Sequence, residues 1–553
     1  MSDTTGSGPM LAADGRPLKE SLGRALRRQK LRALALIAPL LFFVVLTFVI
    51  PIVSMLIRSV DNEIVETTLP GTVPALAAWD STQSDMPSED VYQNMFFDVF
   101  NAAEAREHTK LGSRLNYETT GLASLFRTSG RNMDSVGEVF QDAIEEVDPR
   151  FEDGAFWYEM MNGTGGEALL DQRRARWENL TEDDMSGDIG FTPSQAIIEI
   201  LPTTAAAYTD WAIWTAIDDE DVVAEEDPWE SVYAALAIDL RDPATGTALA
   251  SYQGPGADAL QTLAAASLPD LTMTQAFLDL DEDWGDKDVW ETIAVYSPAV
   301  TPGYFLNAVD AQLTPDGVQM RPENEQLYIQ LFIRTLQMSL IITGSCILLG
   351  YPIAWLLANL PVRTANVLMI LVLLPFWTSL LVRTSAWKVL LQTQGVINEI
   401  LVWLGFVDDA NRLVLMNNST GTIIAMTHIL LPFMILPLYS VMKTIPPTYL
   451  RAAKSLGATN WTAFWRVYFP QSVPGIGAGS ILVFILAIGY YITPEIVGGT
   501  DGVFISNRIA YHISSSLNWG LAAALGTILL VLVMALYWVY DRIVGIDNVK
   551  LGG

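Results

Sequence analysis

The sequence predicts an all-α membrane domain of six transmembrane helices joined to a large acidic insert of mixed or mainly α structure. Hydrophobic residues make up 51% of the 553 residues, and the mean hydropathy of +0.30 is high for a water-soluble protein. Charge is divided unevenly, because residues 60–327 hold 52 of the 62 acidic residues and only 12 of the 32 basic ones. The chain therefore combines a net basic membrane portion with an acidic portion that faces water.

Six apolar runs are long enough to cross a bilayer, which takes about 20 residues in a helix. The first, 33–57, follows a basic tail at 1–32, so the positive-inside rule places the N-terminus in the cytoplasm. A cleaved signal peptide is the alternative, but this run is too long for one and no small-residue cleavage site follows. Six spans also return the C-terminal tail, 546–553, to the cytoplasm. The remaining spans are expected at about 331–358, 366–390, 421–443, 477–498 and 521–540.

The acidic insert, 60–327, lies between the first two expected spans and therefore on the outer side of the membrane. Its length suits one or two domains, and its many aromatic residues can form a core, so we do not expect disorder. Pieces such as Gly137–Glu146 and Ala155–Met161 look helical, but we recognise no motif. Its acidity suits a solubilising surface, and attraction of cations or docking of a partner protein are the functional alternatives.

A polar segment, 446–475, separates the fourth and fifth expected spans. Two prolines start a helix, since a proline in the first turn loses no hydrogen bond, and Gly457 supplies the left-handed residue that often ends one. Thr459 or Asn460 can cap a second helix, Trp461–Phe469, which we expect to end before the proline that follows. The segment is thus a helix–turn–helix outside the bilayer, on the cytoplasmic side.

The spacing within this segment resembles the EAA loop of ABC-importer permeases. That pattern is Glu-Ala-Ala, three residues, Gly, nine residues, Ile, one residue and Leu-Pro. One position departs from it, because arginine stands where the family has glutamate. The residues at the matching places are Arg451, Ala452, Ala453, Gly457, Val467, Phe469 and Pro470.

The resemblance extends over about 328–545, which is similar to the spermidine/putrescine type of binding-protein-dependent permease. Members usually connect their first two spans by a short loop, so the insert is a departure. The supporting phrases are LLPFWTSLLVRTSAW at 373–387, GVINEILVWLG at 395–405, LPFMILPLYS at 431–440 and ITPEIVGG at 492–499.

The resemblance implies a multi-pass permease of the bacterial inner membrane, with the insert in the periplasm and 446–475 as the cytoplasmic coupling loop. It implies two cytoplasmic ATP-binding cassette subunits, a second permease and a periplasmic solute-binding protein as partners. ATP and Mg would be bound by the partner ATPases, so no cofactor is expected in this chain. A polyamine is the favoured solute, and another small organic solute is the alternative. A receptor or a membrane enzyme built on the insert is the remaining rival, although no signalling module or catalytic constellation supports either.

The chemistry-bearing residues predict a transport subunit, not an enzyme. The chain lacks a G-x-x-x-x-G-K-[ST] phosphate loop, its three histidines have no metal spacing, and Cys346 is its one cysteine. Ionisable and aromatic residues in or beside the spans are candidates for a solute path, since charges inside a membrane are costly. Structural roles in helix packing and at the membrane interface are the alternative for each, and Arg383 and Lys388 are expected to extend outward. The candidates are His428, Tyr490, Tyr491 and Glu495.

Overall fold

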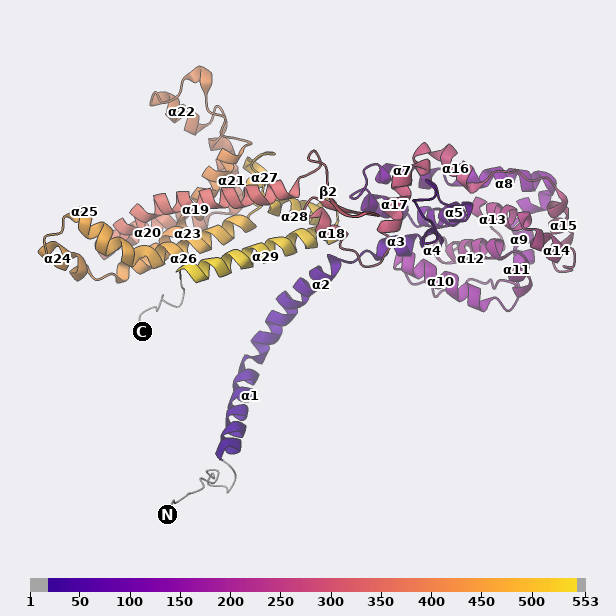
Figure 1. The fold of residues 1–553 in the computed structure, drawn as a ribbon, viewed down its shortest axis with the longest axis horizontal. Helices are drawn as coiled ribbons and strands as arrows, with labels where there is room; N and C mark the ends of the chain where they lie inside the picture. The colour runs from indigo at the N-terminus through magenta and orange to yellow at the C-terminus, as the bar shows by residue number, and fades with distance from the viewer. Residues whose placement is uncertain (1–17, 545–553) are drawn as a thin grey trace, which may run out of the picture.

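The computed structural model describes residues 18–544. The start of the expected basic tail, 1–17, and the expected C-terminal tail, 546–553, lie outside the described residues. The molecule is elongated, with the insert at one end and a bundle of long helices at the other (Figure 1). The N-terminal part of the first helical stretch lies away from the bundle (Figure 1). The C-terminal part of this stretch reaches the junction between the two parts and contacts the bundle there (Figure 1).

The membrane part contains five helical stretches that are long and apolar enough to cross a bilayer, or six if one bent pair counts as a single span. Its elements are α1 (Leu18–Val44), the π-helical turn η1 (Val45–Val49), α2 (Ile50–Arg58), α19 (Tyr328–Asn359), α20 (Val362–Leu373), the 3₁₀ turn η4 (Leu374–Trp377), α21 (Leu380–Leu390), α22 (Val396–Trp403), the 3₁₀ turn η5 (Asp409–Asn411), α23 (Ser419–Thr444), α24 (Pro447–Ser455), α25 (Asn460–Ala463), the π-helical turn η6 (Phe464–Tyr468), α26 (Phe469–Gly489), α27 (Ile492–Val497), α28 (Ile505–Ser514) and α29 (Trp519–Val544).

The helices α19, α23 and α26 form the centre of this bundle. Small residues let their backbones approach closely: a Cβ on Gly479 would lie 2.6 Å from the sulfur of Met434. Gly475 and Gly479 therefore allow close packing of α26 against α23. Cys346 is fully buried in the same core.

The expected span 366–390 is broken. The stretch Val362–Trp377 meets α21 at an angle of 95°, and the chain between them passes through η4, which contains Pro375. A proline removes a helical hydrogen bond and favours such a break. The sequence predicts a kink at Pro375, and the structure has a sharp bend there. That the two helices together form one span stays a prediction.

The fifth span also differs from its expected bounds of 477–498. A continuous helical stretch runs from Asn460 to Gly489, and α27 follows as a separate short helix. The predicted helix end before Pro470 is wrong. The π-helical turn η6 carries the helix into this proline, because a π turn already replaces the regular i→i−4 bonds there.

The insert is built from short helices packed around a continuous hydrophobic core, in which Trp157, Trp211 and Trp284 are almost fully buried. Its helices are α3 (Glu63–Thr68), α4 (Thr72–Leu76), α5 (Glu89–Glu104), α6 (His108–Leu115), α7 (Leu122–Arg131), α8 (Asp134–Val147), α9 (Gly154–Met161), α10 (Glu167–Thr181), α11 (Gln195–Ile200), α12 (Pro202–Ile217), α13 (Glu230–Arg241), α14 (Pro243–Leu249), α15 (Ala257–Ala265), α16 (Met273–Leu280), α17 (Lys287–Val295) and α18 (Gly303–Asn307), with the 3₁₀ turns η2 (Pro149–Glu152) and η3 (Glu282–Gly285). An antiparallel hairpin of β1 (Ala311–Thr314) and β2 (Gly317–Met320) precedes α19.

The insert is fixed to the bundle by a small hydrophobic cluster that includes Tyr304 of α18 and Leu521 of α29. A Cβ on Gly520 would lie 2.4 Å from the ring of Tyr304, so only glycine allows this contact. Tyr117 of the insert also lies against His512 of α28, with 5.9 Å between the ring centroids. The two parts therefore pack directly against each other.

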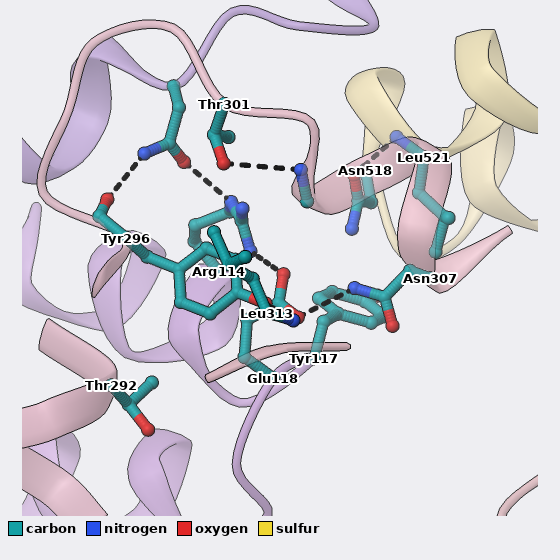
Figure 2. A network of polar contacts seen from close by, with 12 residues as sticks. Arg114, Tyr117, Glu118, Thr292, Tyr296, Thr301, Asn307, Leu313, Asn518 and Leu521 are labelled. Carbon is teal, nitrogen blue, oxygen red and sulfur yellow. Dashed lines mark hydrogen bonds and ion pairs between the residues drawn. The ribbon is translucent and has the colours of Figure 1, made fainter. Parts of the chain in front are cut away.

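A buried polar network reinforces this junction (Figure 2). Glu118 accepts hydrogen bonds from Arg114 Nη1 at 2.6 Å and from Asn307 Nδ2 at 2.9 Å. Arg114 Nε donates to Asn62 Oδ1 at 2.9 Å, and its guanidinium lies 4.2 Å from the ring centroid of Tyr304. The Arg114 and Glu118 side chains are 4% and 2% exposed. Glu118 also pairs with Arg321 at 3.4 Å, whereas Glu118 is the carboxylate partner of Arg114, so removing Glu118 would leave Arg114 as a buried charge without such a partner.

The start of the insert is hydrogen-bonded to the segment that follows α17. The N–H of Asn62 donates to the carbonyl of Ala299 at 2.8 Å, and the N–H of Thr301 donates to the carbonyl of Val60 at 2.9 Å. These bonds hold together two segments that are more than two hundred residues apart in the sequence.

Candidate coupling segment and solute path

The segment 446–475 forms the predicted helix–turn–helix at the end of the bundle opposite the insert, where α24 and α25 are labelled (Figure 1). Gly457 ends the first helix with φ +91°, a conformation that side-chain-bearing residues rarely adopt. Thr459 then caps α25, because its Oγ1 accepts a hydrogen bond from the N–H of Thr462 at 3.2 Å. Local sequence chemistry thus determines this turn.

Most of the segment's surface is open. Among the residues that match the EAA spacing, Arg451, Ala452, Gly457 and Pro470 are exposed, and Ala453, Val467 and Phe469 are half-buried. The nearby side chains of Leu456 and Trp461 are 89% and 72% exposed. Exposed large apolar side chains at a helical turn are typical of a protein interface.

Aromatic side chains anchor the open segment to the bundle. Tyr468 is buried and stacks on Phe464, and Tyr351 of α19 contacts both Phe464 and Phe469. The Tyr351 hydroxyl also lies 2.9 Å from Ser472 Oγ. These anchors were not predicted, although the aromatic run FWRVYF is visible in the sequence. They connect the segment to α19 and α26.

The four candidate solute-path residues fall into two groups. In the first, His428 Nδ1 accepts a hydrogen bond from Trp387 Nε1 at 3.1 Å. Arg383 lies close enough to act electrostatically on both His428 and Tyr490. We expected Arg383 to extend outward, but it is half-buried and its Nε lacks a hydrogen-bond partner within residues 18–544. Arg383 and Trp387 therefore belong to this group, which joins α21, α23 and the end of α26.

Glu495 and Tyr491 form the second group, around α27. Asn507 Nδ2 donates to Glu495 Oε2 at 2.6 Å and to the Tyr491 carbonyl at 2.9 Å. The Glu495 and Tyr491 side chains are both exposed, so they remain accessible while Asn507 fixes this loop. The sequence gave no reason to select Asn507, because an asparagine beside a short helix has no distinctive spacing.

The described residues contain no group of three or more His, Cys, Asp or Glu side chains that could hold a metal ion. The expectation of a transport path without a resident cofactor remains a prediction.

Taken together, the features define a multi-pass α-helical membrane protein with an exposed helix–turn–helix at one end of its bundle. Residues 350–545 match the family model described as "Binding-protein-dependent transport system inner membrane component". The chain belongs to this family, and it is a permease subunit of an ABC importer, a transport component without an ATPase site of its own. A receptor is therefore not favoured.

Curated relatives match the same portion. The spermidine/putrescine transport system permease protein PotB of Salmonella typhimurium strain LT2 is 38% identical over 222 residues, which cover 40% of this chain and 77% of the relative. The inner membrane ABC transporter permease protein YdcU of Escherichia coli K12 is 32% identical over 253 residues, covering 44% of this chain and 79% of the relative.

A solved structure, that of a bacterial alginate ABC transporter in complex with its pentasaccharide-bound periplasmic protein, is also similar. It is 19% identical with a TM-score of 0.34, and the match covers 41% of this chain and 81% of that one.

Proposed function

We propose that this chain is the permease subunit through which a polyamine such as spermidine or putrescine is imported. The observation that carries this proposal is the 38% identity to a spermidine/putrescine permease over 77% of that relative's length. The match includes the spans that would surround the solute. The first group of path residues, at His428 and Tyr490, and the second, at Glu495 and Tyr491, are the proposed lining of the path.

The proposed assembly contains two cytoplasmic ATP-binding cassette subunits, a second permease and a periplasmic solute-binding protein. In this assembly both termini and the segment 446–475 face the cytoplasm, and the insert faces the periplasm. The separation of insert and coupling segment at opposite ends of the bundle supports this orientation (Figure 1). So does the basic character of the segment, which contains Arg451, Lys454 and Arg466 but no acidic residue.

Alternating access follows from the same geometry. ATP-driven closure of the partner subunits would move α24, and the aromatic contacts of Phe464 and Phe469 would pass that motion to α19 and α26. The turn at Gly457 keeps α24 and α25 in a fixed relation during the movement. Arg451, in place of the family's glutamate, would change the charge of the contact with the ATPase.

The substitution Gly457→Pro tests this mechanism. Proline fixes φ near −65° and has no N–H, whereas Gly457 has φ +91° and donates its N–H to the Lys454 carbonyl at 3.0 Å. We expect ATP-dependent spermidine uptake by the reconstituted transporter to fall to background while the variant still inserts into membranes.

Gly405→Pro is the matched control, because Gly405 also follows a helix, has φ +74° and donates its N–H to a carbonyl three residues earlier, at 3.0 Å. Normal uptake by Gly457→Pro, or equal loss in both variants, would contradict the coupling role. An Ala453→Cys variant adds a direct test, since Cys346 is fully buried and the new thiol should crosslink to the ATPase. Uptake of a different solute, without uptake of spermidine or putrescine, would contradict the proposed substrate.

A further inference from the structure

The insert contains a cavity of about 700 Å³ between α3, α5, α10 and α12. This volume lies in the range of small-molecule sites, roughly 300–1,000 Å³. The cavity adjoins the place where the insert meets the first span: its lining includes Glu63, five residues after the end of α2, and Ala299, which is bonded to Asn62. The coupling mechanism makes no use of it.

Two ion pairs occupy the inner wall of the cavity. Arg176 Nη2 lies 2.8 Å from Asp98 Oδ1, and Arg173 Nη2 lies 2.7 Å from Asp210 Oδ2. Both carboxylates are almost fully buried, and Asp98 Oδ2 also accepts hydrogen bonds from Thr72. Each guanidinium therefore already has a carboxylate partner held in place by the fold. These arginines do not supply net positive charge for an anionic ligand.

The lining also contains carboxylates without such partners. Glu63 and Glu66 lie three residues apart on α3, line the cavity and are exposed to it. Neither forms an ion pair with any residue of the described chain. With the arginines matched by Asp98 and Asp210, these two glutamates give the site an excess of negative charge. The acidic residues of 60–327, which exceed the basic ones by 40, add a field of the same sign.

The remaining lining suits the body of an amine. Phe97 provides an aromatic ring, which attracts ammonium groups and packs against methylene chains. Asn94 also lines the cavity, and because its Nδ2 donates to the Asp90 carbonyl at 2.8 Å, its Oδ1 is the atom left to accept from a ligand. Carboxylates, an amide oxygen and an aromatic ring therefore line one open cavity.

We propose that this cavity binds a small organic cation with one or more ammonium groups, Glu63 and Glu66 pairing with those groups. The choice of spermidine as a probe rests on the proposed function, since an imported polyamine would be such a cation. A site in the insert would hold the solute beside the first span, at the end of the bundle farthest from the coupling segment.

The test is a calorimetric titration of spermidine into the purified full-length chain in detergent, at 150 and 500 mM salt. We expect saturable binding that the double substitution Glu63→Gln and Glu66→Gln weakens by about tenfold or more, since two partly exposed charge pairs are lost. The pair Glu146→Gln and Glu152→Gln is the matched control, because these glutamates are exposed and do not line the cavity. Ala206→Phe, which fills part of the cavity without changing charge, should weaken binding at both salt concentrations. A melting curve for each variant confirms that the insert is folded.

Three results would overturn the site. They are an absence of saturable binding, equal weakening by both glutamate pairs (which indicates only a diffuse acidic field) and tighter binding of glutamate or phosphate than of spermidine. Uptake by the reconstituted transporter separates this inference from the proposed function. Spermidine transport with no cavity-dependent binding removes the inference alone, and cavity-dependent binding without spermidine transport removes the proposed substrate alone.

Discussion

At the scale of single residues, Glu104 has surroundings that disfavour its ionised form. It is the last residue of α5, where burial, with repulsion from Asp134, Glu230 and Asp219, raises its pKa to about 7. A carboxyl group with a raised pKa favours folding in its protonated form. Near neutral pH, ionisation of Glu104 therefore destabilises the folded insert.

This predicts how the stability of the insert changes with pH. An unfolded glutamate ionises near pH 4.5, so the protonated form contributes stability below that value, and the contribution is lost as the pH rises through 7. Glu104→Gln, which cannot ionise, should raise the melting temperature at pH 8 and change it little near pH 4.5. Melting curves at the two pH values check this, with Glu146→Gln as an exposed control. A variant that melts below the wild type at pH 8 would contradict it.

At the scale of elements, the start of α19 depends on a residue far outside that helix. Asp310, which is 1% exposed, accepts hydrogen bonds from the N–H groups of Leu327, Tyr328 and Ile329 at 3.0, 2.9 and 2.7 Å. These N–H groups have no partner within the helix itself. The last residue of the insert's α18–β1 connection thus caps the second span.

Asp310→Asn should loosen this helix start by about 1–2 kcal/mol, because the N–H of Ile329 loses its acceptor, Oδ2, while Oδ1 can still accept from Leu327 and Tyr328. Asparagine retains the size and tolerates the φ of +54° at this position, but it presents a donor where the helix N–H groups need an acceptor. Hydrogen exchange over 327–332 should become faster by roughly tenfold. Asp316→Asn, in the exposed turn of the hairpin, is the control and should leave exchange there unchanged. Equal exchange in both variants would show that the cap is not needed.

The same elements show which features the sequence could predict. The turn at Gly457 and the helix cap follow from local backbone chemistry. The turn was predicted at the correct residue, and the cap was predicted at Thr459 or Asn460, of which the structure uses Thr459. The helix through Pro470 was not, because η6 depends on aromatic packing between Phe464, Tyr468 and α19. The sharp bend before α21 and the position of Arg383 also depend on tertiary contacts. Hydropathy identifies a span, but the direction of a broken one is determined by its neighbours.

The candidate site was predictable to a similar degree. The EAA spacing selected 446–475 as the candidate coupling segment, because the spacing is a local pattern that can be read from the sequence. The coupling role itself stays a prediction. The candidate path residues were selected as ionisable or aromatic residues near spans. That they form two separate groups, one beside Arg383 and one held by Asn507, could be seen only in the folded structure. The cavity in the insert brings together helices far apart in sequence, from α3 to α12, without a motif.

At the scale of the whole molecule, the insert is closed on itself. Backbone hydrogen bonds join its start, at Val60 and Asn62, to Ala299 and Thr301, which follow α17, so the core between these points does not require the bundle to bring them together. A chain in which a short Gly/Ser linker replaces 63–298 needs only to bridge neighbouring residues.

We expect this shortened chain to insert into membranes and to copurify with the ATPase, because its coupling segment lies at the opposite end of the bundle (Figure 1). It should also lose the spermidine binding that depends on the cavity. Copurification from solubilised membranes measures the first outcome, with the full-length chain as reference. Failure of the shortened chain to recover the ATPase would mean that the insert is needed to build the permease.

The closure at Asn62 and Thr301 also has an evolutionary consequence. A coding segment can enter a gene at one loop without shifting the register of any span, provided that its product begins and ends at the same point. The part of the acidic domain between Asn62 and Ala299 meets that condition, so a single insertion is sufficient to add it without moving a span. Contacts such as those of Tyr304 with Gly520 and of Asp310 with α19 would then be later adaptations that fixed the added domain to the membrane bundle.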